Sequence, residues 1–273
     1  MKMVAASKLR RAQEAVEAAR PYAQRMERIL SNLAIGAAGQ GGVPAMLAGT
    51  NKNDIHMIIV MTANRGLCGG FNANIIRAAR NLITEVDREG KGFKLYCVGR
   101  KGRDNLRRDY ESRIVASFDE FGRKVTGFNE AEAVAEKITA LFEVGEFDVC
   151  TIIYSSFKSA MLQKVTRQQI IPFPVVEAEA EAAKGEASLG HYEYEPSHTE
   201  ILKTLVPHNL AIQILRALLE NGASEQGARM TAMDNATRNA AEMIDDLTLT
   251  YNRTRQALIT NELIEIISGA EAV

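Results

Sequence analysis

Apolar residues recur at helical spacing toward the end of the chain, from His208 to Ser268. This run of 61 residues contains no proline and is followed by Gly269, so it predicts one long helix. At about 1.5 Å per residue that helix would be roughly 90 Å long, too long to bury its apolar stripe within one small domain. Its apolar positions, with threonine at two of them, alternate spacings of three and four, the period of a coiled coil. They are Met230, Met233, Thr237, Ala240, Ile244, Leu247, Tyr251, Thr254 and Leu258.

A second coiled-coil pattern lies in residues 2–34, which are rich in the helix-favouring residues Ala, Arg, Glu and Gln. Pro21 should kink this helix or remove one of its hydrogen bonds. Two such patterns at the two ends of a chain predict an antiparallel pair, and two unrelated amphipathic helices on one globule are the alternative. The shorter helix would cover roughly half of the longer one. Its seam consists of Ala5, Leu9, Ala12, Val16, Ala19, Ala23, Met26, Leu30 and Leu33.

Between these helices the pattern changes to short apolar runs that alternate with amphipathic segments. Such alternation predicts a mainly parallel sheet with helices on both faces, and Lys164–Ile171 alternates in polarity like an edge strand. The predicted fold class is therefore α/β: an antiparallel coiled coil of the N- and C-terminal helices plus a Rossmann-like domain between them. The other strands are expected at Ile55–Thr62, Phe93–Val98, Arg113–Phe118 and Phe147–Tyr154, and the helices at Asn74–Asp87, 101–108 and Glu130–Phe142.

Loops and caps predict where these parts begin and end. A glycine-rich loop from Gly36 to Gly49 follows the first helix, and an acidic, alanine-rich stretch predicts a loose surface loop. Ser197 and Glu200 form a capping box that would start one helix, and Pro207 would open the long one. The expected division is residues 1–35 for the N-terminal coiled-coil helix, 52–176 for the α/β domain, 177–196 for the acidic loop and 197–273 for the C-terminal coiled-coil helix.

Composition and charge exclude several classes of protein. The net charge of −1 argues against a general binder of nucleic acids or membrane surfaces, although residues 1–30 carry seven Lys or Arg against three Glu. The longest fully apolar run, Met57–Met61, is far too short to span a membrane, and nothing at the start resembles a signal peptide. Three cysteines without metal-ligand spacing predict buried, reduced thiols in a cytoplasmic compartment: Cys68, Cys97 and Cys150.

Few residues are placed where catalysis would need them. The glycine-rich turn at 66–70 follows a strand and precedes a helix, but its glycines do not have the G-x-G-x-x-G spacing of a dinucleotide site. A helix N-terminus at this turn could hold an anion, yet a tight turn with close helix–strand packing is the favoured interpretation. No catalytic residue, cofactor or metal site is therefore predicted. The histidines share no metal-ligand spacing either: His56, His191, His198 and His208.

The end of the long helix is apolar around most of its circumference. At about 100° per residue its apolar side chains spread over roughly 240°. Such a tip is normally buried, because a free one would promote aggregation. Either the tip folds back onto the α/β domain of its own chain or another protein encloses it like a sleeve, and the length of the helix favours the sleeve. The side chains are Leu258, Ile259, Leu263, Ile264, Ile266 and Ile267.

Four segments resemble the γ subunit of F-type ATP synthases. They are Met3–Arg11 (MVAASKLRR), Arg65–Asn72 (RGLCGGFN), Ala223–Ala236 (ASEQGARMTAMDNA) and Tyr251–Ala270 (YNRTRQALITNELIEIISGA). They cover both ends and the middle of the chain in the family's order. The resemblance implies that the terminal helices form the central stalk of a rotary motor, whose apolar tip turns inside a ring of α and β subunits. The α/β domain would lie near the membrane, against the ε subunit and the c-ring.

The same resemblance implies a mechanical role for a subunit that is not itself an enzyme. The shaft would couple proton-driven rotation of the c-ring to conformational cycling of the catalytic β subunits, and would regulate ATPase activity and proton flow. It would bind no cofactor and no nucleic acid, and it would be peripheral on the cytoplasmic face of a bacterial inner membrane without spanning it. The implied contacts to the β subunits come from Met1, Arg229, Arg255, Gln256, Thr260 and Glu262.

The sequence departs from the family pattern at its start. Members normally carry about twenty more residues before the matching segment, roughly 30 Å of helix. A misassigned start, a cut chain or a really short form would each explain this, and a really short form would leave the upper shaft a single helix. A nucleotide-dependent enzyme with a helical oligomerisation arm is the rival interpretation, and nucleotide binding to the isolated chain would distinguish it. A generic coiled-coil scaffold is a third, but it leaves the apolar tip unexplained.

Overall fold

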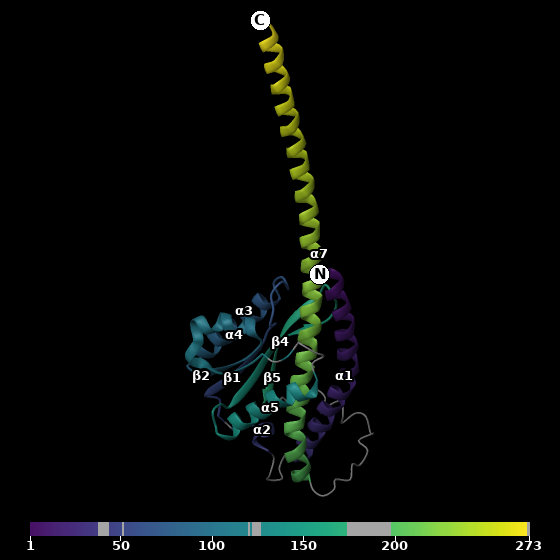
Figure 1. The fold of residues 1–273 in the computed structure, drawn as a ribbon. Coiled ribbons are helices and arrows are strands. Elements are labelled where there is room, and N and C mark those ends of the chain that lie inside the picture. The colour runs from purple at the N-terminus through teal and green to yellow at the C-terminus, as the bar shows by residue number, and fades with distance from the viewer. Residues whose placement is uncertain (38–43, 51, 120, 122–126, 174–197, 272–273) are drawn as a thin grey trace. The chain divides into compact units, whose positions relative to one another are not determined.

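The computed structural model of the chain describes residues 1–37, 44–50, 52–119, 121, 127–173 and 198–271 (Figure 1). The chain divides into two compact units, residues 1–231 and residues 232–273. The first unit holds the sheet, the helices that cover it and the first part of the last helix, and the second unit is the rest of that helix. The division into segments 1–35, 52–176, 177–196 and 197–273 stays a prediction, and the acidic loop 177–196 lies outside the described residues.

A five-stranded sheet forms the centre of the first unit. The strand order is β3-β2-β1-β4-β5, in which the first four strands are parallel and β5 runs antiparallel to β4 at one edge. This confirms the predicted, mainly parallel sheet and its alternating edge strand. The strands are β1 (Ile55–Met61), β2 (Gly92–Val98), β3 (Ile114–Phe118), β4 (Val149–Phe157) and β5 (Gln163–Ile171).

The central strand β1 shows why this sheet is covered on both faces. Successive side chains of a strand point to opposite faces, and in β1 both sets are apolar. Met57 and Ile59 belong to one hydrophobic cluster, and Ile58 and Val60 belong to another. All four side chains are fully buried. A run of apolar residues without polar alternation therefore identifies a strand inside a three-layer α/β fold.

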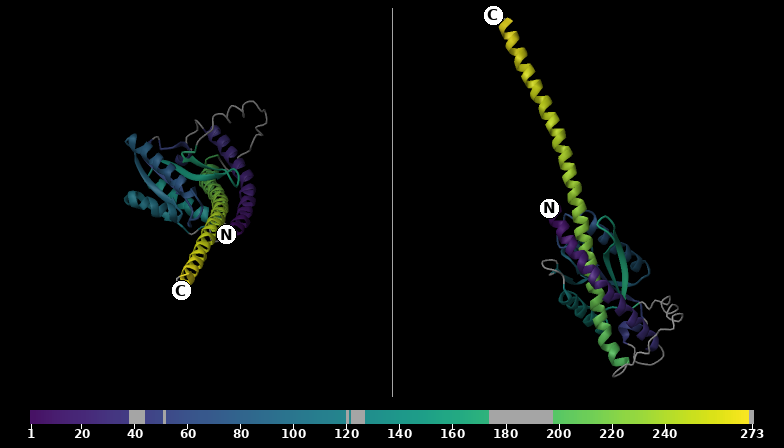
Figure 2. Two further views of the ribbon diagram at one scale, coloured as in Figure 1. Left: turned by 90° about the horizontal axis from the view of Figure 1, so that it is seen from above. Right: turned by 90° about the vertical axis from the view of Figure 1, so that its right-hand side faces the viewer.

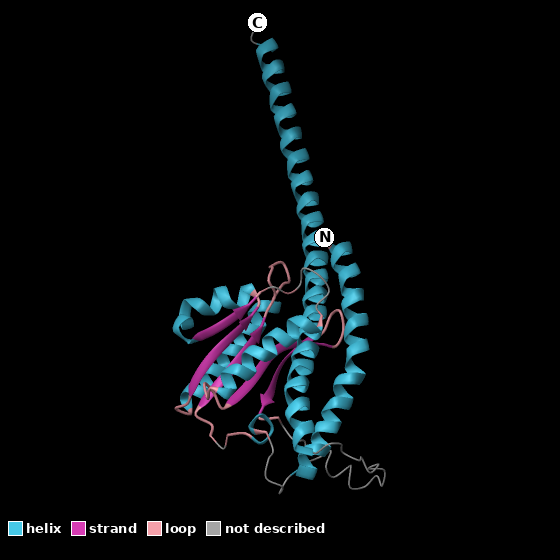
Figure 3. Cartoon of the chain, turned by 60° about the horizontal axis from the view of Figure 1, so that its bottom comes forward, coloured by secondary structure: helices cyan, strands magenta, loops and turns pink. Residues whose placement is uncertain are grey.

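Helices form the two outer layers, one on each face of the sheet (Figure 3). Helices α3 (Phe71–Arg88) and α4 (Arg100–Tyr110) share one cluster with the sheet, and a 3₁₀ turn, η1 (Glu111–Arg113), follows α4. The opposite face is covered by α5 (Phe128–Glu143), by α1 (Lys2–Ala37) and by the first-unit part of α7 (His198–Glu271). Helices α3, α4 and α5 lie where the sequence predicts them, although α3 begins three residues earlier than expected.

Helix α1 and residues 198–231 of α7 lie side by side and run antiparallel (Figures 1 and 2). Leu9, near the start of α1, packs in one cluster with Ala223, whereas Leu30, near its end, lies in another with Leu210. The predicted antiparallel pair is therefore confirmed, and the alternative of two unrelated helices is wrong. The predicted α1 seam supplies its buried apolar side chains: Ala5, Leu9, Val16, Ala23, Met26 and Leu30.

Three details of the terminal helices differ from the prediction. Helix α1 contacts the part of α7 that precedes most of the predicted seam, and Met230, at the start of that seam, packs against the cluster that contains Leu9 and Val16 of α1. Helix α7 is continuous through Pro207, so the predicted break there is wrong. It also runs past Gly269 to Glu271, three residues beyond the expected end at Ser268.

The continuity of α7 at Pro207 has a physical cause. Proline has no N–H and removes one hydrogen bond from a helix interior. However, Leu202 and Val206 before it and Leu210 after it are all buried in the same core cluster. Apolar packing on both sides of the proline therefore keeps the helix in one piece. The predicted capping box at Ser197 lies outside the described residues.

The stretch from Gly36 to Gly49 is predicted to be a loop, but part of it is helical. Helix α1 extends to Ala37, and a short helix, α2 (Ala45–Ala48), occupies part of the stretch. Met46 and Leu47 of α2 are buried in the main cluster. Two apolar side chains anchored in the core account for this turn of helix in a segment whose composition favours a loop.

Candidate functional site

The helical segment that forms the second unit has an unusual surface for a water-exposed helix. Every side chain from Asn235 to Ala270 is exposed. The apolar side chains predicted to form the tip are between 48% and 67% exposed, so none is buried by the described chain. They are Leu258, Ile259, Leu263, Ile264, Ile266 and Ile267.

The threonines of this segment make its surface more apolar than the sequence suggests. Thr237 Oγ1 donates a hydrogen bond to the carbonyl of Met233 at 2.8 Å, and Thr254 Oγ1 donates to that of Thr250 at 2.9 Å. A hydroxyl that bonds to the preceding turn is satisfied within the helix and leaves the methyl group to face outward. The two threonines in the predicted seam therefore present apolar surface, which explains how a coiled-coil period tolerates them.

Polar candidates for partner contacts lie on the same segment. Arg255, Gln256, Thr260 and Glu262 are all exposed, and Thr260 Oγ1 donates to the carbonyl of Gln256 at 2.8 Å. Among the described residues, neither Arg255 nor Glu262 has an ion-pair partner. Their charges are therefore available to another protein, at the small desolvation cost of exposed side chains.

Two further candidates, Met1 and Arg229, belong to the first unit. Met1 is 83% exposed at the start of α1. The Arg229 side chain is only 17% exposed, forms an ion pair with Glu225 at 2.7 Å and donates to the carbonyl of Gly66 at 3.3 Å. Burial raises the pKa of Glu225, although the arginine beside it acts in the opposite direction. Arg229 thus fastens α7 to the loop between β1 and α3.

A nucleotide site on the α/β domain would lie where the strand order reverses, between β1 and β4. At the carboxyl end of β4, the N–H of Ser155 donates to Asn221 Oδ1 at 3.1 Å, and its carbonyl accepts from Ser224 Oγ at 2.9 Å. Asn221 and Ser224 belong to α7, and all three residues are buried. Helix α7 therefore occupies the end of β4 with its own hydrogen bonds.

Two backbone donors near the end of β1 are also occupied. The N–H of Gly102 in the first turn of α4 donates to Thr62 Oγ1 at 2.8 Å. A Cβ atom on Gly99 would lie 2.2 Å from the Thr62 carbonyl oxygen, so strand and helix approach too closely for a side chain. In the loop at 66–70, the N–H of Phe71 donates to the carbonyl of Cys68 at 3.2 Å. These contacts support the tight-turn interpretation of the glycines over an anion site.

The three cysteines are free and buried, as predicted. Burial raises the pKa of the Cys97 thiol to about 12 and also raises the pKa of the Cys68 thiol. Among the described residues, no cluster of His, Cys, Asp and Glu could hold a metal ion. None of the described helices is long and apolar enough to cross a membrane.

Comparisons with known proteins match the whole chain. The family model described as ATP synthase matches residues 1–273. The chain is 57% identical to the ATP synthase gamma chain of Rhodospirillum rubrum and 58% identical to that of Paramagnetospirillum magneticum, in each case over 100% of this chain and 92% of the relative.

Solved structures of similar fold come from mitochondrial complexes. A chain of the central stalk and c-ring of the Tetrahymena thermophila ATP synthase has a TM-score of 0.64 at 27% identity, covering 87% of this chain and 97% of that one. A chain of the Euglena gracilis ATP synthase has a TM-score of 0.62 at 21% identity, covering 98% of this chain and 95% of that one. The second likeness shows the fold alone.

Proposed function

Because this chain belongs to the ATP synthase gamma chain family, we propose that its C-terminal helical segment turns inside a ring of α and β subunits. The chain is a non-catalytic central-stalk subunit of the rotary complex, the rotor shaft through which rotation reaches the catalytic subunits. Its exposed faces would bias each β subunit in turn between conformations, because only contacts that differ between states can shift an equilibrium.

The exposed apolar end of α7 carries this proposal. Fully burying a Leu or Ile side chain contributes roughly 1.5–3 kcal/mol. The six tip residues are about half exposed or more, so a partner that covers them would gain roughly 5–10 kcal/mol. An apolar surface of this kind is unfavourable in water and is typical of an interface. A sleeve of surrounding subunits would cover all of its sides at once.

The polar candidates would make the contacts that change with the angle of rotation. Arg255, Gln256, Thr260 and Glu262 are exposed, so they can exchange one partner for another at little cost. Arg229 is different, because Glu225 and the Gly66 carbonyl already hold it. A contact between Arg229 and a β subunit would compete with that ion pair, so we propose a weaker or conditional role for it.

The remaining partners are assigned by family membership. We propose that the first unit contacts the ε subunit and the c-ring, as part of a proton-translocating complex on the cytoplasmic face of a bacterial inner membrane. The similar Tetrahymena chain comes from a structure of the central stalk and c-ring, which supports this placement. Contacts at that end would connect proton flow to rotation and would let the shaft regulate ATP hydrolysis.

A rival function is nucleotide-dependent catalysis by the α/β domain. It is disfavoured because backbone groups where a nucleotide would bind already have hydrogen-bond partners within the chain. Asn221 and Ser224 of α7 use the backbone groups of Ser155 at the end of β4, and Thr62 uses an N–H at the start of α4. Nucleotide binding to the isolated chain would support the rival function, and our proposal expects none.

Reconstitution tests the proposal. The chain is mixed with purified α and β subunits, and both the stoichiometry of the complex and its ATPase activity are measured. We expect one copy of this chain for every three β subunits and faster ATP hydrolysis than with α and β alone. Changing Ile264 and Ile267 to Ser should weaken the complex, whereas Val144→Ser, at a still more exposed apolar position in the first unit, should not. Absence of a complex with the unaltered chain would contradict the proposal.

A further inference from the structure

A stripe of polar residues runs along the buried face of α7. Asn209, Gln213, Arg216 and Glu220 are spaced by four, three and four residues, so they share one side of the helix. Asn209, Gln213 and Glu220 are at most 3% exposed. Each of the four residues has one buried atom without a hydrogen-bond partner among the described residues. Buried polar atoms are normally paired, so this stripe requires an explanation.

The charged half of the stripe has partners close by. Arg216 Nε lies 3.6 Å from Glu220 Oε1, and Arg20 Nε of α1 lies at the same distance from that oxygen. A small side-chain rotation would bring these groups within hydrogen-bond distance. The neutral half, Asn209 and Gln213, needs a different partner.

A chain of hydrogen bonds determines which atoms of the neutral half are unpaired. The Tyr154 hydroxyl of β4 donates to Gln168 Oε1 of β5 at 3.3 Å. Gln168 therefore presents its Nε2 to Gln213 Oε1, at 3.2 Å. This leaves Gln213 Nε2 as an unpaired donor, while Asn209 Oδ1, one helical turn away, is an unpaired acceptor. One donor and one acceptor side by side are complementary to a water molecule.

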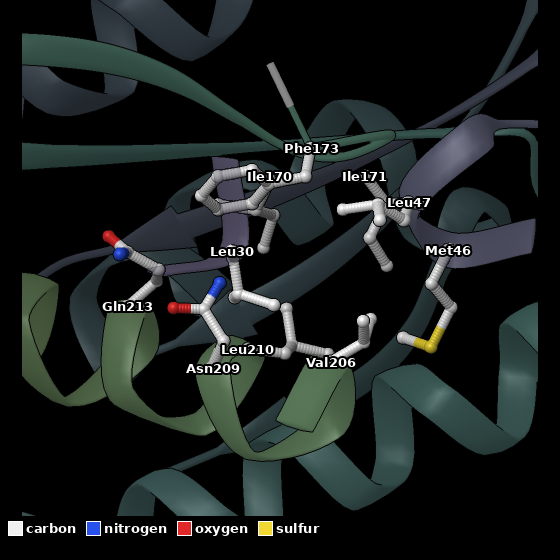
Figure 4. Close-up of a pocket in the computed structure, with 10 residues that line it drawn as sticks. All are labelled: Leu30, Met46, Leu47, Ile170, Ile171, Phe173, Val206, Asn209, Leu210 and Gln213. Carbon is white, nitrogen blue, oxygen red and sulfur yellow. The ribbon is translucent and has the colours of Figure 1, made fainter. Parts of the chain in front are cut away.

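A small cavity lies beside these two amides. Its volume is about 10 Å³, and it is lined by Asn209, Gln213 and eight apolar residues (Figure 4). The amide groups of Asn209 and Gln213 lie together at one end, opposite Met46 and Leu47 of α2. About 10–15 Å³ is the space that a single water requires, and a buried water needs two or more polar partners. The cavity is too small for an organic ligand.

We propose that one ordered water occupies this cavity, accepts a hydrogen bond from Gln213 Nε2 and donates one to Asn209 Oδ1. The water completes a chain from Tyr154 and Gln168 of the sheet to Gln213 and Asn209 of α7. The direct Gln168–Gln213 hydrogen bond joins the sheet to α7, and the water holds the Gln213 amide in the orientation that this bond requires by bridging it to Asn209. The site serves to fix the position of α7 on the sheet, independently of what the second unit binds.

A structure of the assembled ATP synthase at a resolution that shows ordered water tests the site directly. We expect one density peak within about 2.7–3.2 Å of both Gln213 Nε2 and Asn209 Oδ1. A direct hydrogen bond between the two amides, or an empty cavity, would overturn the proposal.

A double-mutant cycle provides the second measurement. In the assembled complex, hydrogen exchange of the α7 backbone at residues 202–218 is compared for Asn209→Leu, Gln213→Leu and the double variant. Asn209→Leu removes the bridge alone and should speed exchange by about tenfold, whereas Gln213→Leu also removes the hydrogen bond from Gln168 and should speed it more. Once Gln213 is Leu no bridge is left, so adding Asn209→Leu should change exchange little. Effects that multiply would show that the amides act separately and would contradict the bridge. Asn74→Leu, an exposed amide on α3, is the control and should leave this exchange unchanged.

Discussion

Replacing Glu220 with Ala should selectively loosen the pairing of α1 with α7. The Glu220 side chain is 3% exposed, and its Oε1 lies 3.6 Å from both Arg20 of α1 and Arg216 of α7. Arg216 also lies 3.7 Å from Glu27 of α1. Without the Glu220 carboxylate, Arg20 loses this ion pair and Arg216 keeps only its pair with Glu27 among the ion pairs of the described residues.

The magnitude follows from the burial of the three groups. Removing one partner of a fully buried ion pair costs about 3–5 kcal/mol, because the other charge is left uncompensated. The Arg20 and Arg216 side chains are 37% and 26% exposed, so they can regain part of their hydration. We therefore expect a loss of roughly 2–3 kcal/mol from the free energy of separating α1 from α7. At 1.4 kcal/mol for each factor of ten, this is about 30- to 140-fold.

Hydrogen exchange of the α1 backbone, followed by mass spectrometry in the assembled complex, measures this opening. The control is Glu14→Ala, since Glu14 pairs with Arg10 at 3.2 Å on a surface where both side chains are at least 65% exposed. Such surface pairs contribute little, so the control should leave exchange nearly unchanged. If Glu220→Ala and Glu14→Ala accelerate exchange equally, the buried network does not hold the two helices together.

Three other perturbations test the first unit of the chain. Gly99→Ala adds a Cβ 2.2 Å from a carbonyl oxygen at a φ of +108°, whereas Gly145→Ala adds one where φ is +77° and nothing lies within 4 Å. In urea titrations Gly99→Ala should therefore lower the unfolding free energy more than Gly145→Ala does. Equal losses would show that the clash is relieved. Burial raises the pKa of Glu225 above its usual value, so the folded state binds its proton more tightly and the unfolding free energy should fall as the pH rises above about 4.5. Glu225→Gln should flatten this dependence, and an unchanged pH profile would contradict it. Cys97 and Cys150 are fully buried, and burial raises the pKa of both thiols. Both should therefore resist alkylation in the native chain and react after unfolding, as measured by mass spectrometry. Rapid labelling of the native chain would be inconsistent with the fold.

Periodicity predicts the parts of the fold in which local pattern and packing agree. The heptad positions of α1, such as Leu9 and Val16, are buried against α7 as expected. The apolar run of β1 is a central parallel strand, because both of its faces are apolar. In each case every side chain at the buried spacing is apolar, so no long-range contact opposes the local preference.

Prediction fails where tertiary packing decides the outcome. Pro207 signals a helix boundary, but Leu202 and Leu210 are buried on either side of it and keep α7 continuous. Met46 and Leu47 similarly anchor a helical turn within a stretch whose glycines favour a loop. A single sequence does not reveal which neighbours these residues meet.

The candidate site was predictable in part. The apolar surface near Ile264 follows from the sequence alone, since its residues surround the helix. The pairing of Arg229 with Glu225 has a recognisable signal, the spacing of four residues, but its contact with the Gly66 carbonyl joins positions far apart in the sequence. The polar stripe at Asn209 and Gln213 also has helical spacing, yet only the structure shows that it is buried.

Site-specific cross-linking tests the shaft assignment most directly. A photoreactive amino acid is placed at Ile264 in the C-terminal segment and, as a control, at Val144 in the first unit, both of which are more than half exposed. In the assembled ATP synthase, illumination should join position 264 to an α or β subunit and stop ATP hydrolysis, whereas position 144 should give no such link. A complex in which position 264 is not joined to the α and β ring, or in which a joined shaft leaves hydrolysis unchanged, would contradict the account.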